Sequence, residues 1–304
     1  MYDPDMPEHQ PPRDIAAQRE QLEIAAREGQ TKAMIEMAVL LQNADPPEID
    51  TALIWWRRAA DAGDTEAMAY LGAVAFRQDP PDAAGAMHWW MLAAQAGNAE
   101  AMALVGGMLA EADPPDLEGS RHWNQQAAER GDTTAMVNFG LQLGYGDPPD
   151  PDACRRWIQL SAEKGNAAGM VILGRLLGDS DPPDLGGARR WWRRAAERGD
   201  ADAVVMLSAM IAVEGDWNQA SALLQQASRR GVEHASDYLN AIDQDSAVRE
   251  RACSTLRSIA DDEYAGVYLG LAALRSGDRD QARAEWTTVA QAHDMSLASA
   301  LLKI

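Results

Sequence analysis

Apolar residues recur along this chain at intervals of three and four positions, which is the spacing of one face of an α-helix. Residues 52–63 hold one such stripe, formed by Ala52, Trp55, Trp56, Ala59, Ala60 and Gly63. Residues 65–76, TEAMAYLGAVAF, hold a second stripe of alanine, methionine, leucine and glycine. The pattern predicts two kinds of helix, named here helix B for the tryptophan-bearing stripe and helix A for the methionine-bearing one.

The two stripes repeat with a fixed step of 34 residues. The first Asp of a DPPD or DPPE segment falls at positions 45, 79, 113, 147 and 181. A closing Gly falls at positions 63, 97, 131, 165 and 199. A period of this size is typical of a stacked helix–turn–helix unit. The sequence therefore predicts an all-α fold, a right-handed α-solenoid of helix–turn–helix repeats.

The residues between the stripes predict where each helix begins and ends. The closing Gly suits the left-handed position after helix B, and the Asp or Asn that follows suits the N-cap of helix A. A residue before Pro is disfavoured in the α conformation, so we expect the last acidic residue of DPPD to start helix B. The alternative places the first Asp as the N-cap, with both prolines in the first turn.

Two adjacent columns of residues define the expected core of helix B. The first column holds Trp at positions 55, 89, 123, 157 and 191. The second is more permissive and holds Trp56, Trp90, Asn124, Ile158 and Trp192. An indole flanked by small residues fills the gap between repeats. We expect Trp191 to be buried and Arg189 to be solvated.

Helix A carries a methionine column at positions 34, 68, 102, 136 and 170, which ends in Val204. At helical spacing beside leucine and glycine, this column is expected to be core. Residues 215–231 keep the layout, with Leu223 and Leu224 in the two tryptophan columns. The step from Gly199 to Gly231 is 32 instead of 34, so the repeat degrades here.

Three regions follow from these patterns. Residues 1–13 are acidic and Pro-rich, and we expect a disordered tail there. Residues 14–231 carry the repeats, beginning with a more polar capping helix over 14–28. Residues 232–304 are expected to hold degenerate helical repeats and a C-terminal cap. The helices expected in this last region lie near 233–242, 246–260, 262–275, 279–292 and 294–303.

The charge balance narrows the classes of partner. The chain has 27 Lys and Arg against 47 Asp and Glu, a formal charge of −20. Nucleic-acid binders carry clustered basic residues, so we expect no nucleic-acid partner. There is no run of about 18 apolar residues and no signal-peptide core, so we expect no membrane association. The two cysteines, Cys154 and Cys253, suit a reducing compartment, and we expect a cytoplasmic location.

A search for catalytic and metal-binding motifs gives little. There is no Gly-rich phosphate loop, HExxH, GxSxG or CxxC. His88 and His122 share a column one period apart, but equivalent positions on neighbouring repeats lie about 10 Å apart, too far to share one ion. Cys154 falls in a small-residue column and is expected to be buried. We expect no enzymatic activity, no cofactor and no metal.

The order AMxxLG in helix A, followed by Dx3Ax2Wx3AAx2G in helix B, resembles the Sel1-like repeat, a relative of the tetratricopeptide repeat. The residues that carry this resemblance include Ala67, Leu71, Gly72, Asp82, Ala86, Trp89, Ala93, Ala94 and Gly97. The loop between the helices departs from the family, because DPPD is shorter than the usual Gly-containing link. The resemblance implies an adaptor or scaffold that binds other proteins. Some secreted members have been linked to β-lactam hydrolysis, but their paired cysteines in each repeat are missing here.

If the tetratricopeptide layout holds, helix A lines the concave face of the solenoid. The candidate partner-binding residues on that face are Phe76, Arg77, Leu141, Tyr145 and Arg175. Such a face suits a peptide with apolar anchors. The leading hypothesis is a non-enzymatic protein–protein interaction module, an adaptor or scaffold, whose partner is another protein or a peptide. The alternatives are a self-assembling structural solenoid and, more remotely, a hydrolase related to the secreted Sel1-like β-lactamases.

Overall fold

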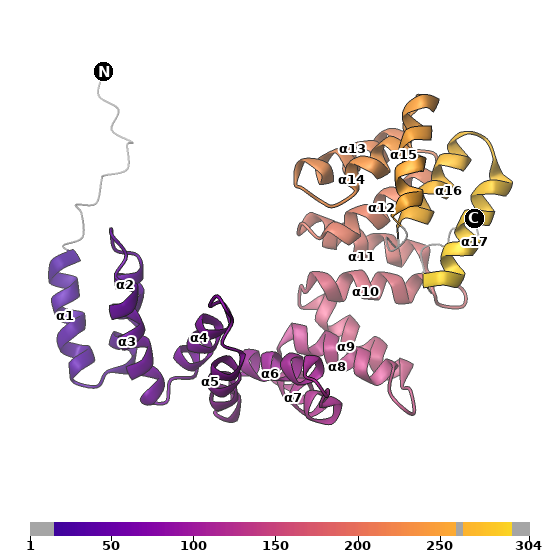
Figure 1. Ribbon diagram of the computed structural model, residues 1–304. Helices are drawn as coiled ribbons and strands as arrows, with labels where there is room; N and C mark the ends of the chain where they lie inside the picture. Colours follow the sequence, from indigo (N-terminus) through magenta and orange to yellow (C-terminus); the bar gives the residue numbers. More distant parts are fainter. Residues whose placement is uncertain (1–14, 260–263, 294–304) are drawn as a thin grey trace, which may run out of the picture. The chain divides into compact units, whose positions relative to one another are not determined.

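The computed structural model describes residues 15–259 and 264–293, and these ranges form seventeen α-helices and no strand (Figure 1). The fold is therefore all-α, as the repeat predicts. It divides into two compact units, Met1–Ala135 and Met136–Ile304. The 34-residue spacing of the repeats is unchanged across the boundary between the two units. The tail expected over 1–13 and the closing helix expected over 294–303 lie outside the described residues.

Unit 1 is a row of antiparallel helices in which each helix contacts the next along the chain. Its complete helices are α1 (Ile15–Arg27), α2 (Thr31–Gln42), α3 (Ile49–Asp61), α4 (Thr65–Phe76), α5 (Ala83–Gln95), α6 (Ala99–Glu111) and α7 (Leu117–Glu129). The first is the capping helix expected over 14–28. Even-numbered helices are of type A, and α3, α5 and α7 are of type B.

The turns between helices are capped as the sequence predicts. The Asp64 carboxylate accepts a hydrogen bond from the backbone N–H of Ala67 at 2.8 Å, which satisfies an N–H at the start of α4. The Asp116 carboxylate does the same for Gly119 in α7 at 2.8 Å. The last acidic residue of the DPPD loop, not the first, therefore starts helix B. Gly63 has φ +93°, which confirms a left-handed residue after α3.

The first loop ends in Glu48 in place of the capping Asp. Its side chain makes no cap; instead its two carboxylate oxygens accept hydrogen bonds from Arg19 of α1 at 2.7 and 3.0 Å. The Arg19 guanidinium lowers the pKa of the Glu48 carboxyl below its ordinary value. Because both side chains stay more than a third exposed, water screens this pair and it ties α1 to α3 only weakly.

From α5 onward, the second tryptophan column lies deeper between the helices than the first, whereas in α3 both tryptophans are buried. Trp90 is 4% exposed and donates its indole N–H to the Ala69 carbonyl of α4 at 3.0 Å. This close approach is possible because Gly72 has no side chain, and a Cβ there would overlap the indole. In α2 the position of the glycine is held by Ala38. The indole N–H of Trp56 accordingly bonds no backbone carbonyl of α2 and donates to the side chain of Gln42 at 3.2 Å.

Unit 2 begins within α8 and contains the remaining described helices. They are α8 (Thr133–Gly144), α9 (Pro151–Glu163), α10 (Ala167–Gly178), α11 (Leu185–Glu197), α12 (Ala201–Val213), α13 (Trp217–Arg229), α14 (Ala235–Ala241), α15 (Ser246–Ser258), α16 (Ala265–Arg275) and α17 (Arg279–His293). The last four confirm the helices expected over 233–242, 246–260, 262–275 and 279–292 to within about three residues at each end.

The expectation for Trp191 and Arg189 is wrong. Trp191 is only half-buried, whereas its neighbour Trp192 is 1% exposed and donates to the Val171 carbonyl at 3.1 Å. Helix α11 is rotated so that the second column faces α10, where Gly174 admits the indole. Arg189 is not simply solvated, because its guanidinium pairs with the Glu214 carboxylate at 2.6 Å.

The C-terminal part of unit 2 departs from a simple row of hairpins. Ten successive residues of α12, from Ala203 to Ala212, are buried, so this helix is covered on all sides. It contacts α11, α13 and also α16, which comes four helices later. The buried hydroxyl of Tyr268 on α16 lies 2.5 Å from the Ser208 hydroxyl and donates to the Val205 carbonyl at 3.0 Å. Because α14 has only seven residues, α16 reaches α12 beside it.

Candidate partner-binding surfaces

The predicted binding residues of unit 1 lie at the C-terminal end of α4. Phe76 is the last residue of the helix and is 49% exposed. Its ring lies 5.6 Å from the Trp90 ring, measured between centroids, so one face rests on the core while the other meets solvent. Arg77 is the C-cap of α4 and is exposed. The pair presents an aromatic ring and a cation side by side along the chain.

In unit 2 the position equivalent to Arg77 is held by Tyr145, one residue after α8, and the position equivalent to Phe76 is Gly144. Its side chain is 88% exposed, the highest value among the large hydrophobic residues that the structure describes as exposed. Its backbone N–H donates to the Leu141 carbonyl at 2.9 Å. This bond continues the last helical turn and holds the backbone of Tyr145 in place. Leu141 itself is half-buried and packs against the core of unit 2. Of these two residues, Tyr145 is the one open to a partner.

Arg175 is engaged within unit 2. It lies on α10, is half-buried, and donates from Nη2 to the Tyr264 hydroxyl at 3.2 Å. Tyr264 precedes α16 and is buried, so this contact joins two helices that are far apart in sequence. Arg175 therefore also holds the C-terminal helices in place, a role that sequence reasoning did not foresee.

The residues considered for chemistry lie apart from one another. His88 and His122 are both exposed, on α5 and α7. No group of three or more His, Cys, Asp or Glu within residues 15–259 and 264–293 is arranged to hold a metal ion. Cys154 is 6% exposed, as expected, and burial raises the pKa of its thiol. No helix in the described part of the chain is long and apolar enough to cross a membrane.

A surface groove that the sequence analysis missed lies between successive B helices. In unit 1 it runs between α3 and α5 over α4, and it is a shallow hollow of about 290 Å³. Trp89 lies in this groove, and the guanidinium carbon of Arg57 lies 5.9 Å from the centroid of its ring. A cation over an indole face is a favourable arrangement. Trp89 of the first tryptophan column is half-buried and thus fills the groove, whereas Trp55 of the same column is 6% exposed and belongs to the core.

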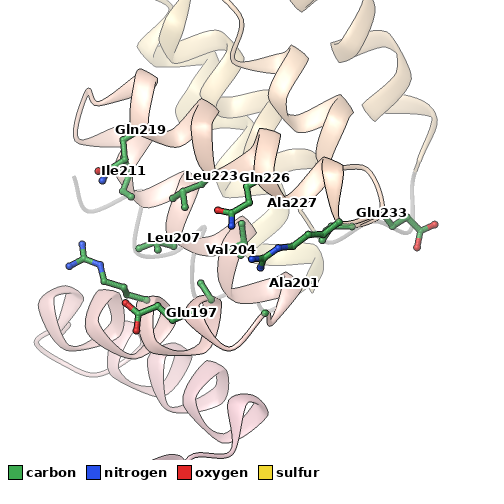
Figure 2. A pocket seen from close by; sticks show the side chains of 16 residues that line it. Glu197, Ala201, Val204, Leu207, Ile211, Gln219, Leu223, Gln226, Ala227 and Glu233 are labelled. Carbon is green, nitrogen blue, oxygen red and sulfur yellow. The ribbon is translucent and has the colours of Figure 1, made fainter. Parts of the chain in front are cut away.

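The equivalent groove in unit 2, between α11 and α13 over α12, is much larger at about 870 Å³ (Figure 2). Figure 2 shows Val204 and Leu207 pointing into it from α12 and Leu223 from α13. Val204 ends the methionine column and Leu223 ends the first tryptophan column, so both are smaller than their counterparts. The change to a smaller residue at these two positions is the feature of the sequence from which the larger groove could have been predicted.

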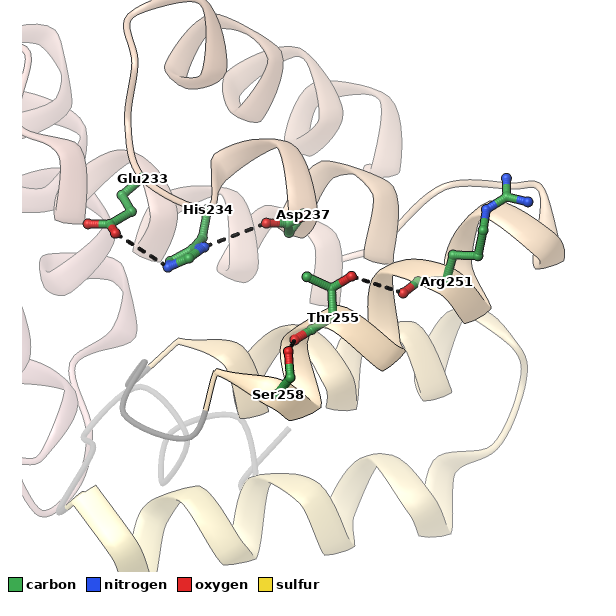
Figure 3. A network of polar contacts seen from close by, with 6 residues as sticks. All are labelled: Glu233, His234, Asp237, Arg251, Thr255 and Ser258. Carbon is green, nitrogen blue, oxygen red and sulfur yellow. Dashed lines mark hydrogen bonds and ion pairs between the residues drawn. The ribbon is translucent and has the colours of Figure 1, made fainter.

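One end of this groove is formed by the turn into α14. His234 has φ +55° and is the one described non-glycine residue with a left-handed backbone. Its ring lies between two carboxylates, at 3.6 Å from Glu233 and 3.6 Å from Asp237 (Figure 3). Glu233 also lines the groove. A non-glycine residue in this conformation costs energy, which the surrounding contacts offset.

Comparison with known proteins places the repeats in a family. A family model described as the Sel1 repeat matches residues 31–64, 65–98, 99–132, 134–166 and 167–200, which is more than half of the chain. A comparison with curated proteins finds no match.

Two of the solved structures that share this kind of fold come from Escherichia coli and Oxalobacter formigenes. The chain is similar to c5321, a protective antigen present in uropathogenic Escherichia coli strains that displays an SLR fold. The identity is 22% and the TM-score 0.67, over 95% of this chain and 67% of that one. A Sel1 repeat protein from Oxalobacter formigenes is 22% identical with a TM-score of 0.54, over 61% of this chain and 80% of that one. At this level of identity the similarity concerns the fold alone.

Proposed function

We propose that this chain, which belongs to the Sel1 repeat family, is a non-catalytic scaffold that binds a partner protein or peptide. Stacked helical repeats of this kind generally present extended surfaces for protein–protein interaction. The surface proposed here is the exposed end of helix A in each unit, with Phe76 and Arg77 in unit 1 and Tyr145 in unit 2. Leu141 on α8 and Arg175 on α10 occupy equivalent helix A positions one repeat apart, and both belong to the proposed surface of unit 2.

The observation that carries the proposal is the exposure of Tyr145 at 88%, together with Phe76 at 49%. A Tyr side chain loses little conformational entropy on binding and combines an apolar ring with a polar hydroxyl, which is why Tyr recurs at binding hot spots. A Tyr that served only the fold would be expected to bury its ring, as Tyr238 and Tyr268 do in the same unit.

A cytoplasmic location and a partner other than nucleic acid belong to the same proposal. Both cysteines are free thiols, which suits a reducing compartment. The formal charge of −20 disfavours binding to a phosphate backbone. A domain arrangement with repeats over 14–231 and a degenerate C-terminal region over 232–304 also stays a prediction.

The proposal is tested by affinity capture from native cytosol with the full-length chain as bait. Tyr145→Ala is expected to weaken capture of a heterologous partner by about 1 kcal/mol or more, roughly fivefold. Arg156→Ala is the matched control, since Arg156 is an exposed helix B residue in the same unit. Arg175→Ala is a poorer test because it also removes the hydrogen bond with Tyr264.

Two results would contradict the scaffold proposal. If Arg156→Ala abolished capture and Tyr145→Ala left it intact, helix B would be the working surface. If the bait enriched only further copies of itself, the self-assembling alternative would hold.

A further inference from the structure

The groove of unit 2 is equivalent in position to the groove of unit 1, but Leu223 stands where unit 1 has the indole of Trp89. Five lining positions correspond between the two through the repeat period. In unit 1 these are Arg57, Leu71, Ala75, Gly85 and Trp89, and in unit 2 they are Arg193, Leu207, Ile211, Gln219 and Leu223. The hollow is three times larger in unit 2, where Leu stands in place of Trp.

The cavity has an apolar floor that a buried ring could contact. Val204, Leu207 and Ile211 of α12 are 8%, 3% and 1% exposed, and each lines the cavity. Leu223 and Ala227 form the α13 wall. The floor itself is nearly shielded from water, so most of the apolar surface that remains exposed lies on the half-buried Leu223. An apolar group in the hollow covers that surface, which is stabilising.

Electrostatics add a preference for an aromatic group over an aliphatic one. In unit 1 the Arg57 guanidinium lies over the Trp89 ring. Arg193 is the equivalent of Arg57 and lines the cavity, but Leu223 offers it no ring. A guanidinium is attracted to the negative face of an aromatic ring and gains nothing comparable from an aliphatic side chain.

We propose that the groove between α11 and α13 is a receptor site for an aromatic side chain, foremost tryptophan, carried by a segment of a partner protein. The ring lies on Val204, Leu207 and Ile211, beside Leu223, with the Arg193 guanidinium over its face. The partner's indole takes the place that Trp89 takes in unit 1. The inference rests on the proposed scaffold function and supplies it with a specific anchor.

The rim of the groove suits a peptide main chain. Gln219 and Gln226 lie on α13 on either side of Leu223 and are exposed, so their amides are free to turn toward the groove (Figure 2). Each amide can both donate and accept a hydrogen bond, which matches the alternating groups of an extended backbone. Arg230 and Glu233 complete the edge with one charge of each sign.

The test uses N-acetyl-5-fluorotryptophanamide as the probe and fluorine NMR as the readout. The probe signal avoids interference from the ten tryptophans of the chain. We expect the full-length protein to broaden this signal in a saturable way. Leu223→Trp fills the groove with an indole from the chain itself and is expected to abolish the broadening. Circular dichroism and the melting temperature establish that this variant is folded.

A matched pair of arginine variants keeps the test decisive if Leu223→Trp fails to fold. Arg193→Ala removes the guanidinium above the proposed ring and is expected to weaken binding about three- to tenfold. Arg57→Ala removes the equivalent guanidinium in unit 1, where Trp89 fills the groove, and is expected to leave binding unchanged.

Three outcomes would overturn the proposal. Broadening that persists unchanged in both Leu223→Trp and Arg193→Ala would place the probe elsewhere. Equal displacement of the probe by N-acetyl-leucinamide and by N-acetyl-tryptophanamide would show an apolar site without aromatic preference. Light scattering that found a native dimer, dissociated by Leu223→Trp, would assign the groove to a second copy of the chain. None of these results depends on partner capture through Tyr145. The scaffold proposal is therefore tested independently of the groove proposal.

Discussion

Trp191 and Trp192 are adjacent in sequence but differ in burial, and their substitution compares the half-buried tryptophan column with the fully buried one. Trp192→Ala is expected to lower the free energy of unfolding by about 3–5 kcal/mol, because a buried indole and its bond to the Val171 carbonyl are lost. Trp191→Ala should cost clearly less, since that ring is half-buried. Urea unfolding of both variants measures the difference. Equal losses would mean that α11 is rotated differently from the structure described here.

The thiol of Cys154 offers a second residue-scale prediction. Burial raises its pKa, so less reactive thiolate is present at neutral pH, and the closed core blocks reagents as well. We expect a thiol reagent to label Cys154 slowly in the native protein and rapidly once it is unfolded in denaturant. Mass spectrometry of peptides after timed labelling gives the rate. Fast labelling of the native protein would show that the small-residue column around Cys154 opens readily.

At the scale of helices, the packing of helix B on helix A depends on glycine at one position. Gly72→Ala is expected to destabilise unit 1 by about 1–3 kcal/mol, because the new Cβ would overlap the Trp90 indole. Gly107→Ala in α6 is the matched control. A Cβ there meets nothing within 4 Å, so the substitution should stabilise by about 0.5–1 kcal/mol through the unfolded chain. Thermal unfolding measures both, and a shift of the same sign in the two variants would count against this packing.

The two aspartates of the DPPD loop test how helix B begins. Asp116→Ala removes the acceptor for the Gly119 N–H and is expected to cost about 0.5–2 kcal/mol. Asp113→Ala should cost little, since Asp113 is exposed and lies outside α7. Urea unfolding midpoints of the two variants give the comparison. The opposite ranking would support the alternative in which the first Asp is the N-cap.

Helix bounds and caps could be predicted from sequence because they depend on residues close together in the chain. The Asp before α4 and the Gly after α3 act within one or two turns, and the 34-residue step repeats these local signals along the chain. The choice between Trp191 and Trp192 could not be made, because adjacent residues both fall within one helical stripe. The groove of unit 2 was missed because Val204 and Leu223 are smaller than the Met and Trp that precede them in their columns, and the effect of this difference appears only when neighbouring helices are placed.

At the scale of the whole molecule, the sequence predicted a continuous array, whereas the structure divides into two compact units. The contact of α12 with α16 and the bond between Arg175 and Tyr264 join residues far apart in sequence. No periodic pattern encodes such contacts, since they depend on the shortness of α14. The candidate site could be predicted only as a helical face, and which of its residues are open to a partner required the structure.

The central claim is that the chain binds a partner through the exposed end of helix A. A photoreactive phenylalanine analogue placed at position 145 tests it most directly, with the same analogue at position 156 as the control. Irradiation in native cytosol should yield one dominant adduct of the position-145 protein with a different polypeptide, and little adduct from position 156. Adducts only at multiples of the chain's own mass, or a dominant adduct at position 156 alone, would contradict the claim.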